Sequence, residues 1–470
     1  PQPPQPWAGL RKSQEPPICM QRRGGNEDCL YLNVFAPTEA ADGLPVLLWI
    51  HGGAYEVGSS LGQDKAVPLL KFYMNRGQPA ILVSMNYRLN VFGFLGSEAL
   101  RLRDEDLSTG NYGLQDQRAA MQWVRENIEA FGGDVARVML FGQSAGAGSV
   151  SAHLCMSRSA GLFSRALMQS GGFSPWSARE MRESEEFYQE ILQVTGCADA
   201  TCLLELSAEE LRSAYDKVSK RAAFDASVMM GSPSIPSSPS IDGVELMAHP
   251  LDMAKAGLVQ NVSMVIGSTT DEGALFFKRY LLNWRDLRSI FLETYAPISG
   301  VEAALNAMRT YLKEKHPALP GKTPEWWAAQ RVLTDQFAAC TSRLAVASLA
   351  NWSFEVFHYV FAHSQGVAAH SSDLPFLFRA LHGAEELELS GAIDDYWLGL
   401  AANNTPMGAE PSWPRAKGNS APFMQLDVAS GGGRRVMFEG FREEQCNFML
   451  SWLEKAMRPN DGRNTQTMPV

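Results

Sequence analysis

The chain has 470 residues, and 45% of them are hydrophobic, which is enough to form a large core. Its formal net charge of −10 at pH 7 argues against nucleic acid or anionic membranes as partners. No apolar run approaches the roughly 18 residues that a transmembrane helix needs, and no long linker divides the chain. We therefore expect residues 1–470 to form a single domain without a transmembrane segment.

Apolar runs along the chain predict buried strands at 46–50, 81–85, 138–141, 262–267 and 354–361. Helical patterns lie between some of these runs, notably at 116–131 and 145–156. Strands that alternate with helices predict an α/β fold, with a large, mostly parallel central sheet and helices on both faces. Ligands bind beyond the carboxyl ends of such strands, so the residues that follow each run are the candidates for a site.

Small residues follow the first run, in the segment His51-Gly52-Gly53-Ala54. The main-chain N–H groups of this segment could face an oxyanion that develops during a reaction. The alternative is a glycine turn that only ends a strand.

One serine follows the run at 138–141, in the segment Gly142-Gln-Ser144-Ala145-Gly146. The Gly-x-Ser-x-Gly pattern is typical of a nucleophile elbow, a strained strand-to-helix turn that exposes a serine hydroxyl. The main-chain N–H of Ala145 would be a further oxyanion donor. The alternative is the start of a helix rich in small residues.

Acidic and histidine residues follow the last two runs. Asp271 and Glu272 come after the run at 262–267, and either could orient a histidine base, unless both are solvated surface groups. His363 and His370 come after the last run, and spacing alone does not choose between them as the base. The chain order of oxyanion glycines, serine, acid and histidine is that of an α/β-hydrolase.

The cysteines give information about the cellular compartment of the protein. There are seven, at positions 19, 29, 155, 197, 202, 340 and 446. Two close pairs, one long pair and one remaining cysteine suit an oxidised extracellular protein, whereas seven free thiols would suit a cytosolic enzyme. No cysteine or histidine has metal-ligand spacing, so neither a metal nor another cofactor is expected. Glycosylation sequons begin at Asn261, Asn351 and Asn403, which is weak support for a secreted or extracytoplasmic location.

Further motifs along nearly the whole chain resemble those of the type-B carboxylesterase family, which includes the cholinesterases. They are Asn26-Glu-Asp-Cys-Leu-Tyr-Leu-Asn-Val34, Asn86-Tyr-Arg-Leu-Asn-Val-Phe-Gly-Phe-Leu95, Gly110-Asn-Tyr-Gly-Leu-Gln-Asp-Gln117, Ala130-Phe-Gly-Gly-Asp134, Thr270-Asp-Glu-Gly273 and Gly366-Val-Ala-Ala-His370. The resemblance implies an α/β-hydrolase fold and a catalytic triad of Ser144, Glu272 and His370. The oxyanion donors that it implies are the main-chain N–H groups of Gly53, Ala54 and Ala145.

Other roles are implied by the same resemblance. Ser170 matches a serine near the family's acid, which implies a supporting hydrogen bond. Trp176 falls where family members place a wall of the acyl pocket, although a core tryptophan is the alternative. Gln143 and Phe276 complete the predicted substrate pocket. The implied disulfides are Cys19–Cys29, Cys197–Cys202 and Cys340–Cys446, with Cys155 free.

Departures from the family pattern narrow the range of expected substrates and bear on how much of the family domain is present. Gln143 stands where the family often has Glu, which weakens the case for cationic choline esters. The Cys19–Cys29 loop lacks the tryptophan with which cholinesterases bind quaternary ammonium, and it is shorter than a lipase lid. The arginine partner of Glu27 is not identified. The chain starts at a Pro-rich block that a sheet segment normally precedes, so the N-terminal part of the family domain is expected to be missing.

The leading hypothesis is a serine carboxylesterase that hydrolyses small to medium uncharged carboxylic esters through an acyl-enzyme on Ser144. Its expected partner is a small-molecule ester, and its expected assembly is a monomer or a homodimer. One alternative is a non-enzymatic, neuroligin-like adhesion or binding protein. The other is a lipase or a hormone esterase of the same family.

Overall fold

A single large sheet organises the fold. The computed structural model describes residues 15–39, 41–219, 235–277, 282–362, 366–417, 421–437 and 441–457. Within them nine strands pair in the order β1-β3-β2-β4-β5-β8-β9-β10-β11. These strands are β1 (Leu32–Phe35), β2 (Leu44–Ile50), β3 (Ile81–Met85), β4 (Gly133–Gln143), β5 (Arg165–Gln169), β8 (Ser263–Thr269), β9 (Val356–Phe361), β10 (Phe423–Leu426) and β11 (Arg435–Met437).

The sheet is mostly parallel, as the sequence predicts. Only β1 and β11, at its two edges, run antiparallel to their neighbours. Strands β2, β4, β5, β8 and β9 are parallel neighbours, so their carboxyl ends meet at one edge. All five predicted strands are present. Strand β4 starts earlier than predicted because its first residues, around Asp134, are polar and partly exposed.

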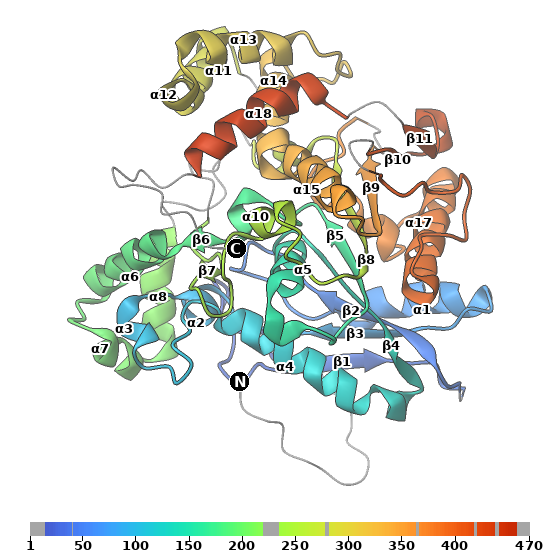
Figure 1. Ribbon diagram of the computed structural model, residues 1–470, viewed down its shortest axis with the longest axis horizontal. Helices are drawn as coiled ribbons and strands as arrows, with labels where there is room; N and C mark the ends of the chain where they lie inside the picture. Colours follow the sequence, from blue (N-terminus) through green and yellow to red (C-terminus); the bar gives the residue numbers. More distant parts are fainter. Residues whose placement is uncertain are drawn as a thin grey trace.

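Alternate side chains of each central strand enter opposite cores. In β2, Val46 and Leu48 face one core and Leu47 and Trp49 face the other. Helices α4 (Tyr112–Asn127), α5 (Ala145–Cys155), α10 (Pro250–Lys255) and α15 (Cys340–Asn351) cover the first face. Helices α1 (Gln63–Asn75), α16 (Leu374–Leu377) and α17 (Ala384–Asn403) cover the second (Figure 1). Both predicted helices are confirmed, one as α5 and the other as α4 with the short turn η1 (Ile128–Phe131).

Further helices form two groups around the sheet (Figure 1). One group comprises α2 (Asn90–Phe94), α3 (Glu98–Arg101), α6 (Met181–Thr195), α7 (Ala200–Glu205) and α8 (Ala208–Ser219), beside the small ladder of β6 (Arg179–Glu180) and β7 (Ser240–Ile241). The other comprises α11 (Trp284–Ile290), α12 (Ala296–Ser299), α13 (Val301–Leu312), α14 (Pro324–Thr334) and α18 (Glu443–Ala456). The π-helical turns η5 (Phe291–Tyr295) and η6 (Asp335–Ala339) interrupt this second group.

Three disulfides stabilise the fold, and one of them ties the second group of helices to the rest of the molecule. All three implied bonds are formed, Cys19–Cys29, Cys197–Cys202 and Cys340–Cys446, and Cys155 is free. The third bond joins α15 to α18 across 106 residues. Closing a loop of that length stabilises the fold by about 4–5 kcal/mol through the entropy of the unfolded chain. None of the helices formed by the described residues has an apolar stretch long enough to span a bilayer.

Candidate active site

Ser144 occupies a strained turn between β4 and α5. Its backbone has φ 57° and ψ −126°, a conformation that costs a non-glycine residue about 1–3 kcal/mol. A Cβ atom at Gly142 would lie 2.5 Å from the main chain of Gly146, and one at Gly146 would lie 2.1 Å from the Ile50 carbonyl oxygen. Only glycine fits at either position. The turn leaves Ser144 8% exposed at the carboxyl edge of the sheet.

His370 and Glu272 form a buried hydrogen-bonded pair. His370 Nδ1 lies 2.5 Å from Glu272 Oε2, and Glu272 has no exposed surface. An imidazole with its proton on Nδ1 donates this bond and keeps a lone pair on Nε2, which is the arrangement that a general base needs. The other carboxylate oxygen of Glu272 accepts a hydrogen bond from the main-chain N–H of Thr269 at 2.7 Å.

The rival acid lies in a separate hydrogen-bond network. Asp271 Oδ1 accepts a hydrogen bond from Gln330 Nε2 at 2.7 Å, and Asp271 Oδ2 accepts one from Thr270 Oγ1 at 2.9 Å. Burial raises the pKa of the Asp271 carboxyl. The adjacent carboxylates therefore differ in environment, and Glu272 is the one in contact with a histidine. The rival base, His363, lies outside the described residues.

Gln143 contacts the other side of the imidazole. Gln143 Nε2 lies 3.1 Å from His370 Nε2, and the Gln143 residue is 3% exposed. The hydroxyl of Ser144 makes no hydrogen bond within the described part of the chain, so in this structure the amide occupies the lone pair that the serine would use. Gln143 is predicted from the sequence to lie in the substrate pocket, and its direct contact with His370 is not evident from the sequence.

The turn that holds two of the predicted oxyanion donors lies against Ser144, since a Cβ atom at Gly52 would lie 3.0 Å from Ser144 Cβ. Gly53, Ala54 and Tyr55 have consecutive positive φ values of 117°, 56° and 58°. The N–H groups of Glu56 and Val57 both bond to the Gly53 carbonyl oxygen, at 2.9 and 3.0 Å, which fixes this turn. Among the described residues, no acceptor takes a hydrogen bond from the main-chain N–H of the three predicted donors, Gly53, Ala54 and Ala145. These groups are free to bind an oxyanion.

Aromatic rings enclose the space beside His370. The ring of Phe276 lies 5.5 Å from the imidazole, and that of Phe337 lies 5.0 Å from it. Trp176 stacks on Phe337 at 5.0 Å and donates a hydrogen bond from Nε1 to the Phe337 carbonyl oxygen at 2.8 Å. Trp176 and Phe276 were predicted in the pocket, whereas Phe337 was missed. It projects from the π-helical turn η6, a feature that often occurs at functional sites, and no apolar pattern in the sequence marks it.

Ser170 does not make the predicted hydrogen bond. Its hydroxyl is buried and has no partner in the described part of the chain, while its main-chain N–H bonds to the Gly267 carbonyl oxygen at 2.8 Å. The position of Ser170 after β5, with φ 55°, places it in the chain but does not fix the direction of its hydroxyl. Thr269 supplies the N–H that supports Glu272, and a main-chain donor of this kind carries no sequence signal.

A second buried carboxyl lies close to the pair. Asp373 Oδ2 accepts hydrogen bonds from Gln169 Nε2 at 2.8 Å and from the Tyr359 hydroxyl at 3.0 Å. Burial, with a smaller contribution from Glu272, raises the pKa of Asp373. The hydrogen bonds from Gln169 and Tyr359 oppose this rise.

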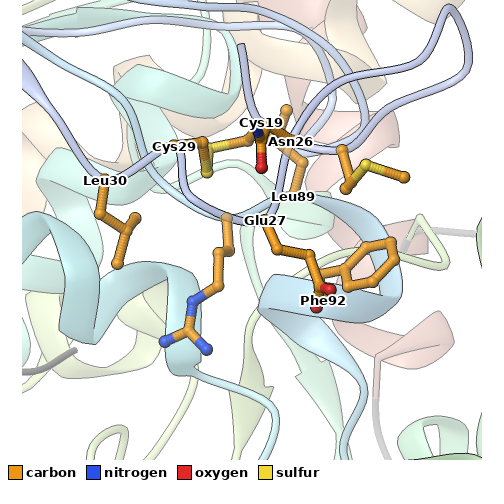
Figure 2. A pocket seen from close by; sticks show the side chains of 9 residues that line it. Cys19, Asn26, Glu27, Cys29, Leu30, Leu89 and Phe92 are labelled. Atoms are coloured by element: carbon orange, nitrogen blue, oxygen red, sulfur yellow. A yellow bond between two sulfur atoms is a disulfide. The ribbon is translucent and has the colours of Figure 1, made fainter. Parts of the chain in front are cut away.

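The Cys19–Cys29 loop braces the oxyanion turn. Gln21 Nε2 donates to the Gly58 carbonyl oxygen at 2.9 Å, and Asn90 Nδ2 donates to the Met20 carbonyl oxygen at 2.9 Å. A cavity of about 380 Å³ lies under this loop, and Figure 2 shows Glu27 in its wall. Arg88 also lines the cavity, but its guanidinium bonds bidentately to Asp116, at 2.8 and 2.7 Å. No cation pairs with Glu27 among the described residues, so its expected arginine partner stays unidentified.

The assembled groups suit acyl transfer. A serine on a strained turn, a histidine with a carboxylate at its Nδ1, and main-chain N–H groups without an acceptor among the described residues are the parts that this chemistry requires. They come from the carboxyl ends of β2, β4, β8 and β9, which are brought together by the parallel sheet.

Comparisons with known proteins agree with this geometry. The model of the carboxylesterase family matches residues 1–449. The chain is 32% identical to the para-nitrobenzyl esterase of Bacillus subtilis over 86% of its own length and 79% of that protein. It is 27% identical to the acetylcholinesterase of Leptinotarsa decemlineata over 98% of its length and 80% of that protein. It is 29% identical to the fumonisin B1 esterase of Sphingopyxis macrogoltabida, over 93% and 82% of the two chains.

Solved structures give the same result. A carboxylesterase of Geobacillus stearothermophilus, determined at pH 6.2, superposes with a TM-score of 0.79 at 29% identity, covering 96% of this chain and 92% of that one. A para-nitrobenzyl esterase structure superposes with a TM-score of 0.74, also at 29% identity, covering 92% and 88% of the two chains. The resemblance drawn from the motifs is thereby confirmed, and the chain belongs to the carboxylesterase family.

Proposed function

We propose that the chain is a serine carboxylesterase that hydrolyses small to medium uncharged carboxylic esters through an acyl-enzyme on Ser144. The observation that carries the proposal is the buried His370–Glu272 pair, together with a serine on a strained turn and three main-chain N–H groups that have no acceptor among the described residues. Relatives named para-nitrobenzyl esterase and fumonisin B1 esterase support ester hydrolysis as the reaction. A neuroligin-like binding protein is not favoured, since these relatives are esterases.

The first half-reaction transfers the acyl group to the enzyme. Ser144 Oγ attacks the ester carbonyl carbon while its proton passes to His370 Nε2. The oxyanion of the tetrahedral intermediate accepts hydrogen bonds from the N–H groups of Gly53, Ala54 and Ala145. His370 then gives the proton to the alcohol oxygen as the carbon–oxygen bond breaks, which leaves the acyl group on Ser144.

The second half-reaction restores the enzyme. Water attacks the acyl carbon and gives a proton to His370 Nε2, and the carboxylic acid leaves as Ser144 recovers that proton. Glu272 holds the imidazole in one orientation and stabilises its charged form in both halves.

The pocket suggests the substrate class. Trp176, Phe276 and Phe337 form an aromatic wall near the base, which suits short or flat apolar groups. The residue before the nucleophile is the uncharged Gln143, so a cationic choline group gains no carboxylate partner there. Uncharged esters of modest size fit this wall best.

Turnover by two serine variants tests the proposal. Ser144→Ala is expected to lower kcat on a short-chain aryl ester by several orders of magnitude, because the nucleophile is lost. Ser151→Ala is the matched control, since Ser151 lies on the same helix and bonds only to the Gly148 carbonyl oxygen, and it should turn over within a few-fold of wild type. Undiminished turnover in Ser144→Ala would contradict the assignment.

Rates on acyl chains of increasing length distinguish the related enzymes. A short-acyl esterase should lose kcat/KM as the chain lengthens and should be indifferent to a lipid interface. Activation by an emulsion of long-chain esters would instead favour a lipase. Selective turnover of one large apolar ester would favour a hormone esterase.

We also propose that residues 1–470 act as one hydrolase domain, in a secreted or extracytoplasmic protein that is a monomer or a homodimer. Three disulfides and the exposure of the sequon residues Asn261, Asn351 and Asn403 support this location. A mass shift on enzymatic removal of N-glycans would support it, and three reduced cysteine pairs in the protein isolated from its source would contradict it.

A further inference from the structure

The amide of Gln143 lies between two parts of the site. Its Nε2 is 3.1 Å from His370 Nε2, and the residue is 3% exposed. On the other side its carbonyl oxygen lies over Gly52, where a Cβ atom would approach Oε1 to 3.0 Å. The absence of a side chain at Gly52 leaves room for the carboxamide in this position.

The hydrogen-bond pattern fixes which group donates. Glu272 accepts from Nδ1, so a neutral His370 carries its proton there and only a lone pair on Nε2. The amide N–H of Gln143 therefore donates to Nε2. A protonated imidazole would present an N–H at this place, and two donors would then face each other.

We propose that Gln143 is a positioning residue that holds the neutral imidazole of His370 in the resting enzyme and yields Nε2 to Ser144 when substrate binds. The inference rests on the proposed function, because it takes Ser144 and His370 as the nucleophile and base. Neither the family membership nor the triad requires it, since a carboxylate at position 143 could not donate this hydrogen bond.

At His370 Nε2, one hydrogen-bond donor replaces another when substrate binds. The bond from the Gln143 N–H to Nε2 breaks, and the Ser144 hydroxyl donates to the same lone pair. The proton then moves from Ser144 Oγ to Nε2 as Oγ bonds to the acyl carbon.

The dependence of kcat/KM on pH measures this role directly, because a hydrogen-bond donor at Nε2 stabilises the neutral imidazole of His370. The titratable groups that face His370 are Glu272, from η4 (Glu272–Leu275), and the buried Asp373 before α16. The rings of Phe276 and Phe337 cover the rest of the imidazole. Both carboxyl groups are unchanged in variants at Gln143, so differences between profiles report on the amide.

The test measures kcat/KM against pH for wild type, Gln143→Met and Gln143→Glu. Methionine keeps the size but removes the donor, so the acid limb should move to higher pH by about 0.5 to 1 unit, a three- to ten-fold change at a fixed acidic pH. Glutamate places an acceptor beside Nε2 and should move the limb further in the same direction. Coincident limbs, or an equal loss of kcat/KM at every pH, would overturn the proposal.

Gln117→Met is the matched control. Gln117 is also a buried glutamine in contact with a histidine, with Oε1 2.9 Å from His153 Nε2, but this pair lies outside the site. Its profile should keep the wild-type acid limb. If Gln143→Met does not fold, Gln143→Leu, which also lacks a donor and a charge, takes its place.

A second readout separates this proposal from the proposed function. Titration of ¹⁵N-labelled histidines by NMR, with His370 assigned by difference from His370→Ala, follows the imidazole without any turnover. A higher titration midpoint for His370 in Gln143→Met than in wild type supports the amide contact even if no ester is hydrolysed. An unchanged midpoint in an active enzyme overturns the contact and leaves the esterase assignment standing.

Discussion

Besides His249, three histidines are buried outside the proposed triad: His51, His153 and His358. Burial lowers the pKa of His51 to about 4 and the pKa of His153 and His358 to about 3. Each is therefore neutral in the folded protein at neutral pH. His51 stacks on Tyr87 at 4.3 Å beside the oxyanion turn, where a charged imidazole would disturb the site.

His358 is predicted to make the folded protein less stable at acidic pH. Both of its ring nitrogens are buried without a partner in the described part of the chain. Its pKa is lower in the folded state than the ordinary value of 6.5, so the unfolded chain binds more protons as the pH falls below that value. The free energy of unfolding then decreases toward pH 4, by up to about 1.4 kcal/mol per pH unit from this group.

Replacing His358 by Phe removes this dependence. The stability of His358→Phe relative to wild type, from urea unfolding at pH 7, 6, 5 and 4, should improve steadily as the pH falls. Phe423→Leu is the control, because Phe423 packs beside His358 at 5.9 Å and does not titrate. A His358→Phe difference that is the same at every pH would show that this histidine does not contribute to acid sensitivity.

At the scale of elements, a network of charges joins α18 to the turn that carries the aromatic wall. Arg442, which precedes α18, bonds through Nε to Asp335 Oδ1 at 2.5 Å and through both terminal nitrogens to Glu314, at 2.7 and 2.9 Å. Asp335 begins η6, two residues before Phe337, and has no exposed surface. Burial raises the pKa of Asp335 and Arg442 opposes that rise. The wall of the pocket thus depends on an ion pair formed far along the chain.

Breaking this network should be costly. Arg442→Met leaves the buried Asp335 carboxyl without its cation, for which we expect a loss of about 3–5 kcal/mol in the free energy of unfolding. Arg182→Met is the control, since Arg182 pairs with Glu186 on an exposed helix surface and its loss should cost about 0–1 kcal/mol. Denaturant unfolding at neutral pH measures both, and equal small losses in the two variants would contradict the structural role of Arg442.

For the whole molecule, the sequence predicted the sheet better than the pocket. The five predicted strands are apolar runs, and consecutive apolar residues are enough to identify a buried strand. Strands β1, β5, β10 and β11 were not predicted. Strand β1 is a half-buried edge, and β5 begins with Arg165 and ends with Gln169. Strands β10 and β11 have only four and three residues. The order of the motifs along the chain and the family resemblance together identified the pair of His370 and Glu272. The strands that precede these two residues are parallel, so their carboxyl ends meet at one edge of the sheet.

The remaining features of the site depend on contacts between distant segments. Phe337 reaches His370 only through the packing of α14 and η6 against the sheet, which no local pattern encodes. The orientation of the Gln143 amide depends on the space above Gly52, and the N–H that supports Glu272 belongs to the main chain. The predicted role of Ser170 failed for the same reason, since its position in the chain does not fix the direction of its hydroxyl.

The most direct measurement of the central claim is labelling of the folded protein with a fluorophosphonate probe, followed by mass mapping of the modified peptide. We expect one modification, at Ser144, that is lost in His370→Ala, because the probe reacts only with a serine activated by its base. The absence of labelling in folded wild-type protein, or labelling at another residue, would contradict the claim.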